Sequence, residues 1–391
     1  MKPLSKKILG ISESPTLSLN AKVKELKSRG VDVVNFTVGE PDFDTPDNVK
    51  KAAIDAIKAG FTKYTPVSGI PELKQAIAEK LKRDNGISYD AKQIIVSCGG
   101  KHSLYNAFQA ICNPGDEVII PSPYWVTYPE QVKLAEARPV FVKTREENGF
   151  RLLAKDLEKC VNKKTKAIII NSPCNPTGAV YDPAELEKIA TIAVDNDVFV
   201  VSDEIYENLV YEGRHVSIAS FGDEIKARTI TINGASKAYA MTGWRIGWAA
   251  GPADIVKAMD NFQSQTTSNP TSISQKAYLE GLQGRQDSVH RMAAEFRKRR
   301  DIIVSRLNGI PGIKCSRPSG AFYAFPNVSG AFRSGIKNSM DFSMQLLEKA
   351  RVAVVPGSDF GAEGYVRISY ACSADTIEKG VERIKEFVSK L

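Results

Sequence analysis

Five short apolar runs, each rich in isoleucine and valine, constrain the fold of this chain more than any other feature. The runs are QIIVS at 93–97, EVIIPS at 117–122, KAIIINS at 166–172, VFVVSD at 198–203 and RTITIN at 228–233. They lack the alternation of apolar and polar residues that marks a strand with one solvated face, so they predict strands buried on both faces of a parallel sheet. Helical segments separate them; at 182–197, for example, Asp182 and Pro183 are typical of a helix start. This alternation predicts a three-layer α/β domain with a mostly parallel sheet.

The pattern changes near residue 285, where a long charged helix is expected to leave the first domain. Beyond it, short apolar stretches such as ARVAVVPG at 350–357 and GYVRISYA at 364–371 precede an amphipathic helix. We therefore predict a large domain over 46–285 and a smaller α+β domain that combines 1–45 with 286–391.

Charge and cysteine content exclude several classes of function. The 53 basic and 45 acidic residues give a net charge of +8, but they are spread along the chain without a basic arm that would favour nucleic acid. The six cysteines form no CxxC pair and the three histidines form no HExxH motif, so we expect no metal site. A signal-peptide core and an apolar stretch of about eighteen residues are both absent, so we expect a cytoplasmic protein that does not enter a membrane.

Candidate ligand-binding residues follow the apolar runs, because ligands of open α/β sheets bind at the carboxyl ends of the strands. Gly99 and Gly100 follow the first run and lead into an expected helix, where backbone N–H groups can approach a phosphate. Two glycines before a helix also form plain turns, so this signal is weak by itself. Lys101 comes next, but Ile95 stands where a P-loop has its first glycine, so a P-loop site is disfavoured.

Further polar residues follow the third, fourth and fifth runs. Asn175 stands in an NPTG turn, where its amide can donate to a ligand oxygen. Asp203 ends a buried run and either caps a helix or faces a cation, with Tyr206 one helical turn later. Lys237 lies among small residues, so its amine can approach a flat ligand, and a desolvated lysine loses its proton readily, as Schiff-base formation requires. Arg245 follows and can bind a phosphate through two hydrogen bonds. Each residue has a plain structural explanation, and only the combination predicts a site.

The stretch GASKAYAMTGWRIG at 234–247 resembles the lysine signature of class I pyridoxal-phosphate-dependent aminotransferases. NPTG and SDEIY stand upstream in the family's order, and the match extends from about residue 12 to the C-terminus through FTVGEPDFDTP, KYTPVSGIPELK, PYWVTYPE, PSGAFY and VRISYA. The bacterial-type branch of aspartate aminotransferases, which includes aspartate/prephenate enzymes, resembles this chain most. The resemblance implies the fold type I of pyridoxal 5′-phosphate enzymes, amino acid and 2-oxo acid substrates, and a homodimer with shared active sites.

The resemblance also implies a role for each candidate residue. Lys237 would bind the cofactor covalently and transfer a proton, Asp203 would pair with the ring nitrogen, and Asn175 and Tyr206 would hydrogen-bond the phenolic oxygen. Trp125 would stack on the ring. The phosphate ligands would be Gly99, Gly100, Lys101, Arg245 and Tyr64 of the second subunit. The substrate would contact Gly39, Lys101, Trp125, Asn175 and Arg367, with Arg367 on the α-carboxylate and Lys101 on the distal carboxylate.

Two positions qualify this resemblance. Many members of the family carry a phosphate-binding serine three residues before the lysine, but this chain has Gly234, where a backbone N–H could substitute. Ser236, next to the lysine, is not assumed to replace it. Position 12 is Ser12, whereas members that use prephenate well tend to have a basic residue nearby, and this favours aspartate over prephenate.

We therefore expect an aspartate aminotransferase that transfers an amino group between L-aspartate and 2-oxoglutarate in a ping-pong reaction. An aspartate/prephenate, aromatic or alanine aminotransferase and a carbon–sulfur lyase remain as alternatives with the same cofactor. A regulatory module that binds the cofactor without turnover is disfavoured, because no segment before the family match resembles a DNA-binding domain.

Overall fold

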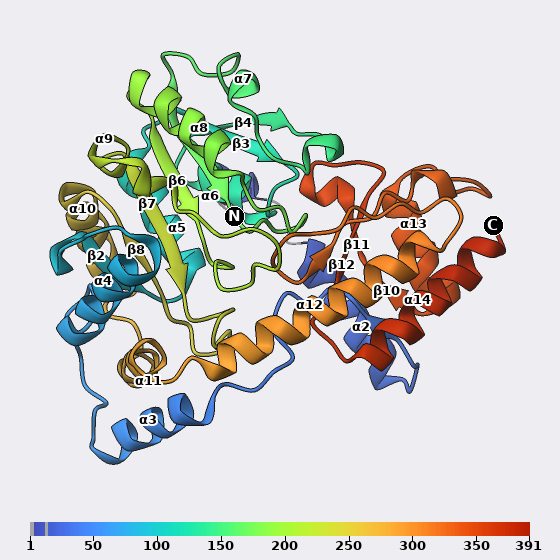
Figure 1. Cartoon of the computed structure of the whole chain (residues 1–391), viewed down its shortest axis with the longest axis horizontal. Coiled ribbons are helices and arrows are strands. Elements are labelled where there is room, and N and C mark those ends of the chain that lie inside the picture. The colour runs from blue at the N-terminus through green and yellow to red at the C-terminus, as the bar shows by residue number, and fades with distance from the viewer. Residues whose placement is uncertain (1–3, 12–14) are drawn as a thin grey trace.

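A seven-stranded sheet forms the centre of the computed structural model, which describes residues 4–11 and 15–391 (Figure 1). In the order of the sheet, its strands are β2 (Ile94–Ser97), β8 (Gly247–Ala250), β7 (Thr229–Gly234), β6 (Phe199–Asp203), β5 (Thr165–Asn171), β3 (Glu117–Ser122) and β4 (Arg138–Lys143). Strand β8 is antiparallel to β2 and β7, and all other neighbouring pairs are parallel. The five predicted strands are all present, and the predicted α/β fold with a mostly parallel sheet is confirmed.

Helices cover both faces of this sheet. They are α3 (Asp47–Lys58), α4 (Pro71–Asn85), α5 (Gly100–Ile111), α6 (Thr127–Leu134), α7 (Ala154–Leu157), α8 (Pro183–Asp195), α9 (Asp223–Lys226), α10 (Ala253–Ser264) and α11 (Ser272–Gln283). Val118 and Ile120 of β3 pack in one core cluster with Leu104 of α5, whereas Ile119 packs in another with Ile189 of α8. Because successive side chains of a strand point to opposite faces, these two clusters separate the three layers.

A smaller part of the molecule is connected to the sheet by the long helix α12 (Asp287–Asn308) (Figure 1). It contains the antiparallel strands β9 (Tyr323–Ala324), β12 (Val366–Ser369) and β11 (Val355–Pro356), and the parallel pair β1 (Val34–Asn35) and β10 (Val352–Ala353). Its further helices are α2 (Pro15–Ser28), α13 (Ser339–Gln345) and α14 (Ala374–Ser389). In the large part, short 3₁₀ turns lie at 91–93, 146–148 and 218–221; in the smaller part they lie at 329–331 and 357–360, with a π turn at 346–350.

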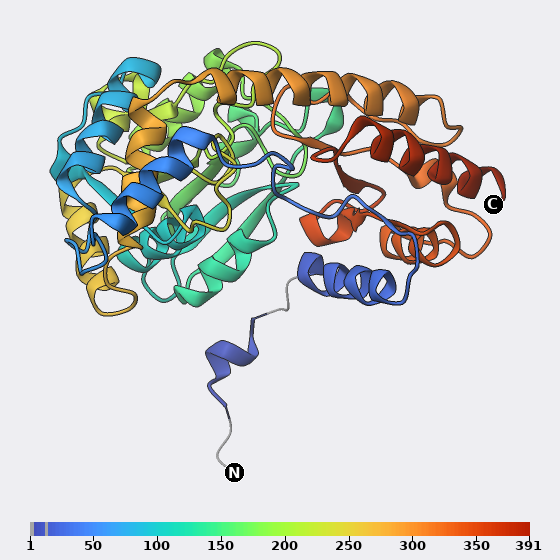
Figure 2. The ribbon, with the colours of Figure 1, turned by 90° about the horizontal axis from the view of Figure 1, so that it is seen from below.

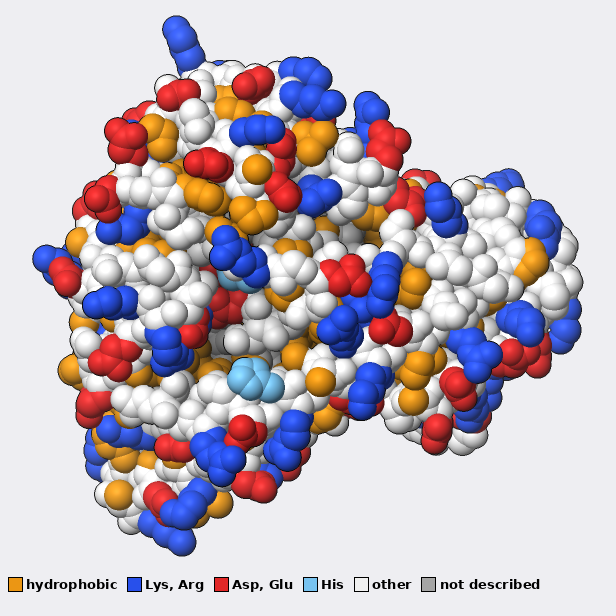
Figure 3. All heavy atoms as spheres, viewed as in Figure 1, with side chains coloured by type: hydrophobic (Ala, Val, Ile, Leu, Met, Phe, Trp, Pro, Cys, Tyr) orange, Lys and Arg blue, Asp and Glu red, His pale blue; other side chains and the backbone are white. Residues whose placement is uncertain are grey.

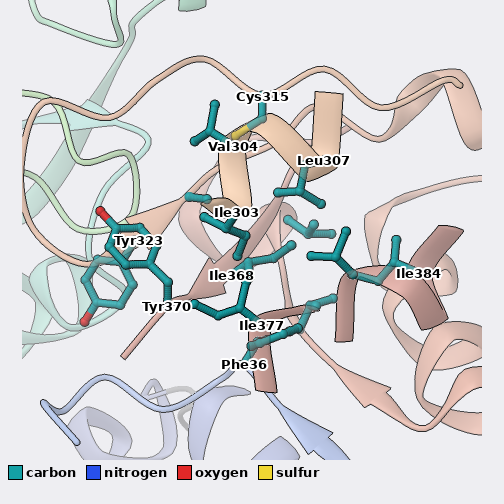
Figure 4. Packing of buried hydrophobic residues seen from close by; sticks show 14 of the residues in the cluster. Phe36, Ile303, Val304, Leu307, Cys315, Tyr323, Ile368, Tyr370, Ile377 and Ile384 are labelled. Carbon is teal, nitrogen blue, oxygen red and sulfur yellow. The ribbon is translucent and has the colours of Figure 1, made fainter. Parts of the chain in front are cut away.

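Residues 34–36 of the N-terminal segment pack with the C-terminal part of the chain rather than with the large sheet. Val34 pairs with Val352, and Phe36 is buried with Ile303, Ile368 and Ile377 in one core (Figure 4). On this ground we propose that 1–45 and 286–391 form one domain and 46–285 the other.

The helix α1 (Lys6–Leu9) projects from the body of the molecule, as Figure 2 shows. Its side chains Ile8 and Leu9 are 58% and 64% exposed. Within the described ranges, no helix is long and apolar enough to cross a membrane.

Candidate active site

A cavity of about 440 Å³ opens at the carboxyl ends of the parallel strands. Most of the predicted site residues line it, namely Gly39, Gly100, Lys101, Trp125, Asn175, Asp203, Tyr206, Lys237, Arg245 and Arg367. Gly99 does not line the cavity itself but lies against the side chain of Arg245, which does. Tyr64 lies outside the cavity and is 91% exposed. The fold thus brings together residues that are separated by up to several hundred positions in the sequence.

Lys237 follows β7 directly, and its side chain enters the cavity. Its Nζ donates a hydrogen bond to the carbonyl oxygen of Gly39 at 2.5 Å. Burial lowers the pKa of Lys237 to about 8, and the positive charges of Arg367 and Arg245 add to this effect while Glu40 opposes it. A substantial fraction of the amine is therefore neutral and nucleophilic near pH 8.

Asp203 ends β6 as a buried carboxylate, 4% exposed. Tyr128 donates its hydroxyl hydrogen to Oδ2 at 2.7 Å, and the backbone N–H of Ile205 donates to Oδ1 at 3.2 Å. Burial raises the pKa of Asp203 to about 6, although both hydrogen bonds lower it. Asp203 forms no ion pair with any described residue, so this buried carboxylate is suited to a cationic group of a ligand.

Arg367 is a second buried charge with an incomplete set of partners. Its Nη1 donates to Asn175 Oδ1 at 3.0 Å and its Nη2 donates to the carbonyl of Thr37 at 2.8 Å. The guanidinium lies 4.6 Å from the centre of the Tyr323 ring. No acidic side chain of the described residues pairs with it, and its Nε has no hydrogen-bond partner there. A guanidinium in this state can bind a carboxylate ligand with two hydrogen bonds.

The glycine turn after β2 and the side chain of Arg245 form the opposite end of the cavity. Gly99 adopts a φ of +93°, and a Cβ there would lie 2.6 Å from Arg245 Nη2. Gly100 begins α5, whose first backbone N–H groups face an anion favourably. Lys101 Nζ lies 4.9 Å from the centre of the Trp125 ring, and burial lowers the pKa of this lysine, as does Arg245. Glycine, a helix start and two cations together suit a phosphate.

Gly234 does not take the place of the missing serine through its backbone. Its N–H donates to Asn233 Oδ1 at 2.7 Å, so the predicted substitute donor is already used. A Cβ at Gly234 would lie 2.6 Å from the Cα of Gly247, the residue paired with it across β7 and β8. Ser236, by contrast, lines the cavity beside Lys237.

Replacing Gly234 by serine is therefore expected to destabilise the protein, although it would restore the residue common in the family. The new Cβ meets backbone rather than a flexible side chain, so the paired strands must separate, and the free energy of unfolding should fall by about 2 kcal/mol or more. Chemical denaturation of the apoprotein measures this, with Ser236→Ala as a variant that introduces no clash. An unchanged midpoint for Gly234→Ser would contradict the expectation.

Two tyrosines of the site were missed in the sequence. Tyr128 contacts Asp203, and Tyr323 shares a hydrogen bond of 2.7 Å with the hydroxyl of Tyr206. Tyr128 and Tyr323 lie in PYWVTYPE and PSGAFY, two stretches that carry the family resemblance, so this signal was available. Ser12, on which the preference over prephenate depends, lies outside the described residues.

The geometry defines an enzyme site that binds an anionic ligand against a reactive lysine. The family model for "Aminotransferase class I and II" matches residues 31–384. The chain belongs to this family and is an aminotransferase.

It is 52% identical over 387 residues to an aspartate aminotransferase of Bacillus sp. (strain YM-2), covering 98% of this chain and 99% of the relative. It is 48% identical to a "Probable aspartate/prephenate aminotransferase" of Aquifex aeolicus, with complete coverage of both chains. The crystal structure of an aspartate aminotransferase from Rhizobium meliloti superposes with a TM-score of 0.97 at 44% identity and covers 100% of both chains.

Proposed function

We propose that this enzyme is an aspartate aminotransferase that uses pyridoxal 5′-phosphate to move an amino group between L-aspartate and 2-oxoglutarate. The observation that carries the proposal is that Lys237, Asp203 and Arg367 meet in one cavity with their charges unpaired. When bound, the cofactor supplies an aldehyde that accepts the amino group and a ring that withdraws electrons from the substrate. The aspartate aminotransferases among the relatives support the choice of substrate.

The residues of the cavity would hold this cofactor at several points. Asp203 would accept a hydrogen bond from the ring nitrogen, and Tyr206 and Asn175 would bind the phenolic oxygen. Trp125 would cover one face of the ring, and Lys237 would bind the aldehyde carbon covalently. The phosphate would bind at the start of α5, with Gly99, Gly100, Lys101 and Arg245 around it.

The same residues would also orient the amino acid and move its proton. Arg367 would bind the α-carboxylate with Gly39 beside it, which fixes the Cα of the substrate within reach of Lys237. The pKa of Lys237, lowered by burial to about 8, suits an amine that removes and returns a proton near neutral pH. Lys101 would bind the distal carboxylate of aspartate.

Lys101→Ala is expected to lower kcat/KM for aspartate by about 10- to 100-fold, because a charge-assisted hydrogen bond to the distal carboxylate is lost. The value for alanine, which has no distal carboxylate, should change much less. Lys74→Ala serves as the matched control, since Lys74 is a partly buried lysine that does not line the cavity. An equal loss for aspartate and alanine would show that Lys101 acts on the cofactor alone.

The experiment that tests the function is a set of half-reactions with aspartate, glutamate, alanine, phenylalanine and prephenate or its amino product. Fastest conversion with aspartate and glutamate supports the proposal. Faster conversion of an aromatic or prephenate-derived partner would favour those alternatives, and keto acid release without amino transfer would favour a lyase. A protein that binds the cofactor but turns over none of these compounds would support the regulatory alternative.

We also infer a cytoplasmic homodimer with shared active sites. Tyr64 is 91% exposed, and Ile54 and Ile57 of α3 are 50% and 52% exposed, as expected for residues that a second copy covers. Figure 3 shows basic and acidic side chains interspersed over one face of the molecule, without a broad basic patch that would favour nucleic acid. Sedimentation at decreasing protein concentration tests the dimer, and a monomer with undiminished activity would contradict it.

A further inference from the structure

A buried cluster of charged side chains begins one residue beyond Asp203 and has no part in the proposed reaction. Its members are Lys80 on α4, Glu204 and Glu207 after β6, and His215 in the following loop. Each of these side chains is at most 8% exposed. Buried charges are expensive unless they are paired, so the arrangement requires an explanation.

Both carboxyl oxygens of Glu204 have hydrogen-bond partners. Its Oε1 accepts from the hydroxyls of Ser202 and Ser217 at 2.8 and 2.6 Å, and its Oε2 lies 3.0 Å from His215 Nε2. The two serine hydroxyls donate to Oε1, which leaves Oε2 free to accept from a protonated His215.

Glu207 is held in the same way by other partners. It forms an ion pair with Lys80, and it accepts hydrogen bonds from Asn233 at 2.7 Å and Asn85 at 3.0 Å. Asn233 lies in β7, four residues before Lys237, so this carboxylate also anchors the strand that leads to the lysine.

Charge balance identifies His215 as the second cation of the cluster. Two buried carboxylates face one ammonium, that of Lys80, and His215 is the remaining base among the described members. Ligand atoms of Glu204, Glu207 and His215 lie within 4.8 Å of one another, a spacing that a metal ion could bridge. The Lys80 ammonium already contacts Glu207, however, and a protonated imidazole balances the remaining charge without a metal, with its Nε2 facing Glu204 and its Nδ1 without a hydrogen-bond partner among the described residues.

The surroundings of His215 act on it in both directions. Burial and the charge of Lys80 lower the pKa of His215, but the contact with Glu204 and the charge of Glu207 outweigh them and raise it above its usual value. The titratable groups that face His215 are therefore Glu204, Glu207 and Lys80.

The cluster reaches the cofactor site through Glu204. Side chains alternate along β6 and its extension, so Ser202 and Glu204 point to one side and Asp203 to the other. The charge of Glu204 is among the causes that raise the pKa of Asp203, after burial, whereas Lys237 lowers it. The titratable groups around Asp203 are Tyr128, Tyr206, Cys174, Glu204 and Lys237.

We propose that protonated His215 neutralises Glu204 and thereby keeps Asp203 ionised where it meets the ring nitrogen of the cofactor. His215 is thus a positioning residue for charge, acting through Glu204. This inference rests on the proposed use of pyridoxal 5′-phosphate.

The first test observes His215 in the apoprotein, without any cofactor. The chain has only three histidines, so selective carbon-13 labelling of the imidazole Cε1 gives a simple spectrum, and loss of one signal in Glu204→Gln/His215→Gln assigns His215. We expect its signal at pH 6.5 to be mainly that of an imidazolium, because the contact with Glu204 raises the pKa of His215. A neutral imidazole at pH 6.5 would overturn the proposal.

The second test measures the effect on Asp203 by calorimetric titration of the apoprotein with pyridoxamine 5′-phosphate, which cannot form a bond with Lys237. In His215→Gln the amide still donates to Glu204 but carries no charge. The pH below which affinity falls should therefore rise by about one unit. Since the pKa of Asp203 is about 6 in the wild type, this means about threefold weaker binding at pH 6.5 and close to tenfold weaker binding at pH 5, where the comparison is made. In Glu204→Gln/His215→Gln both charges are gone, and affinity should return to within about threefold of the wild type.

The double variant separates an electrostatic role from a merely structural one. If His215 only supported the fold, the second substitution would leave binding as weak as in His215→Gln or weaken it further, and that result would overturn the proposal. The same holds if His215→Gln binds like the wild type. A wild-type apoprotein that fails to bind pyridoxamine 5′-phosphate at all would instead refute the proposed function, while the imidazole titration would still stand.

Discussion

Replacement of Lys237 by alanine is expected to abolish turnover together with the visible absorbance of covalently attached cofactor. Lys237 lines the cavity and interacts electrostatically with both Asp203 and Arg367. Proton transfer by a positioned group contributes about 10²- to 10⁴-fold, and the covalent attachment is lost as well, so the rate should fall by at least about 10⁴-fold. The variant should still fold, because Lys237 makes a single hydrogen bond, to Gly39.

Lys237→Arg is the matched control for charge. A guanidinium keeps the positive charge but stays protonated, so it provides neither a nucleophile nor a base. Both variants should bind pyridoxal 5′-phosphate reversibly, and borohydride reduction followed by mass spectrometry should attach the cofactor to the Lys237 peptide in the wild type alone. Activity in either variant, or a reduced adduct on another lysine, would refute the assignment.

The pH dependence of cofactor attachment follows from the same residue. Only the neutral amine reacts, and burial places the pKa of Lys237 at about 8. The rate at which the apoprotein takes up pyridoxal 5′-phosphate should therefore rise as the pH increases through about 8 and level off above it. A rate that continues to rise toward pH 10 would contradict this.

The apolar runs predicted the sheet well because strands buried on both faces must be apolar at every position. The sequence did not predict β4 and β8, because features other than burial on both faces determine their compositions. β4 lies at the sheet edge with Arg138 and Lys143 exposed. β8 is the short stretch GWAA, which begins with Gly247 because the backbone at the start of α5 approaches that residue closely. Neither pattern resembles a buried strand.

The site residues could be proposed from the sequence, but not all of their proximities in the folded chain could be predicted. Asp203 and Lys237 end neighbouring strands, so their proximity follows from the sheet order. Arg367 comes from a different sheet, in which β12 pairs with β11 and β9, and its guanidinium contacts both Thr37 of the N-terminal segment and Asn175 of the large sheet's loops. At Gly234 the sequence motif suggested that a phosphate-binding side chain was missing. The structure shows instead that Gly247 lies too close for any side chain to fit there.

Asp203→Asn is expected to make the apoprotein more stable at pH 7.5 and the enzyme nearly inactive. The folded pKa of Asp203, about 6, lies above the value of about 3.8 for an unfolded aspartate. A carboxylate with a raised folded pKa favours folding only while it is protonated, so its contribution is present below pH 4 and is lost as the pH rises through 6. At pH 7.5 the ionised group opposes folding by up to about 3 kcal/mol.

An asparagine removes this penalty while it keeps the local hydrogen bonds. Its Oδ1 can accept from the Ile205 N–H, and its Nδ2 can donate to the Tyr128 hydroxyl. The unfolding midpoint of Asp203→Asn should therefore exceed that of the wild-type apoprotein at pH 7.5 and match it at pH 4, where the wild-type carboxyl is protonated. Activity should fall by at least about 10²-fold, because a neutral amide cannot stabilise a protonated ring nitrogen. A destabilised variant at pH 7.5, or one with undiminished turnover, would show that Asp203 serves the fold and not the cofactor.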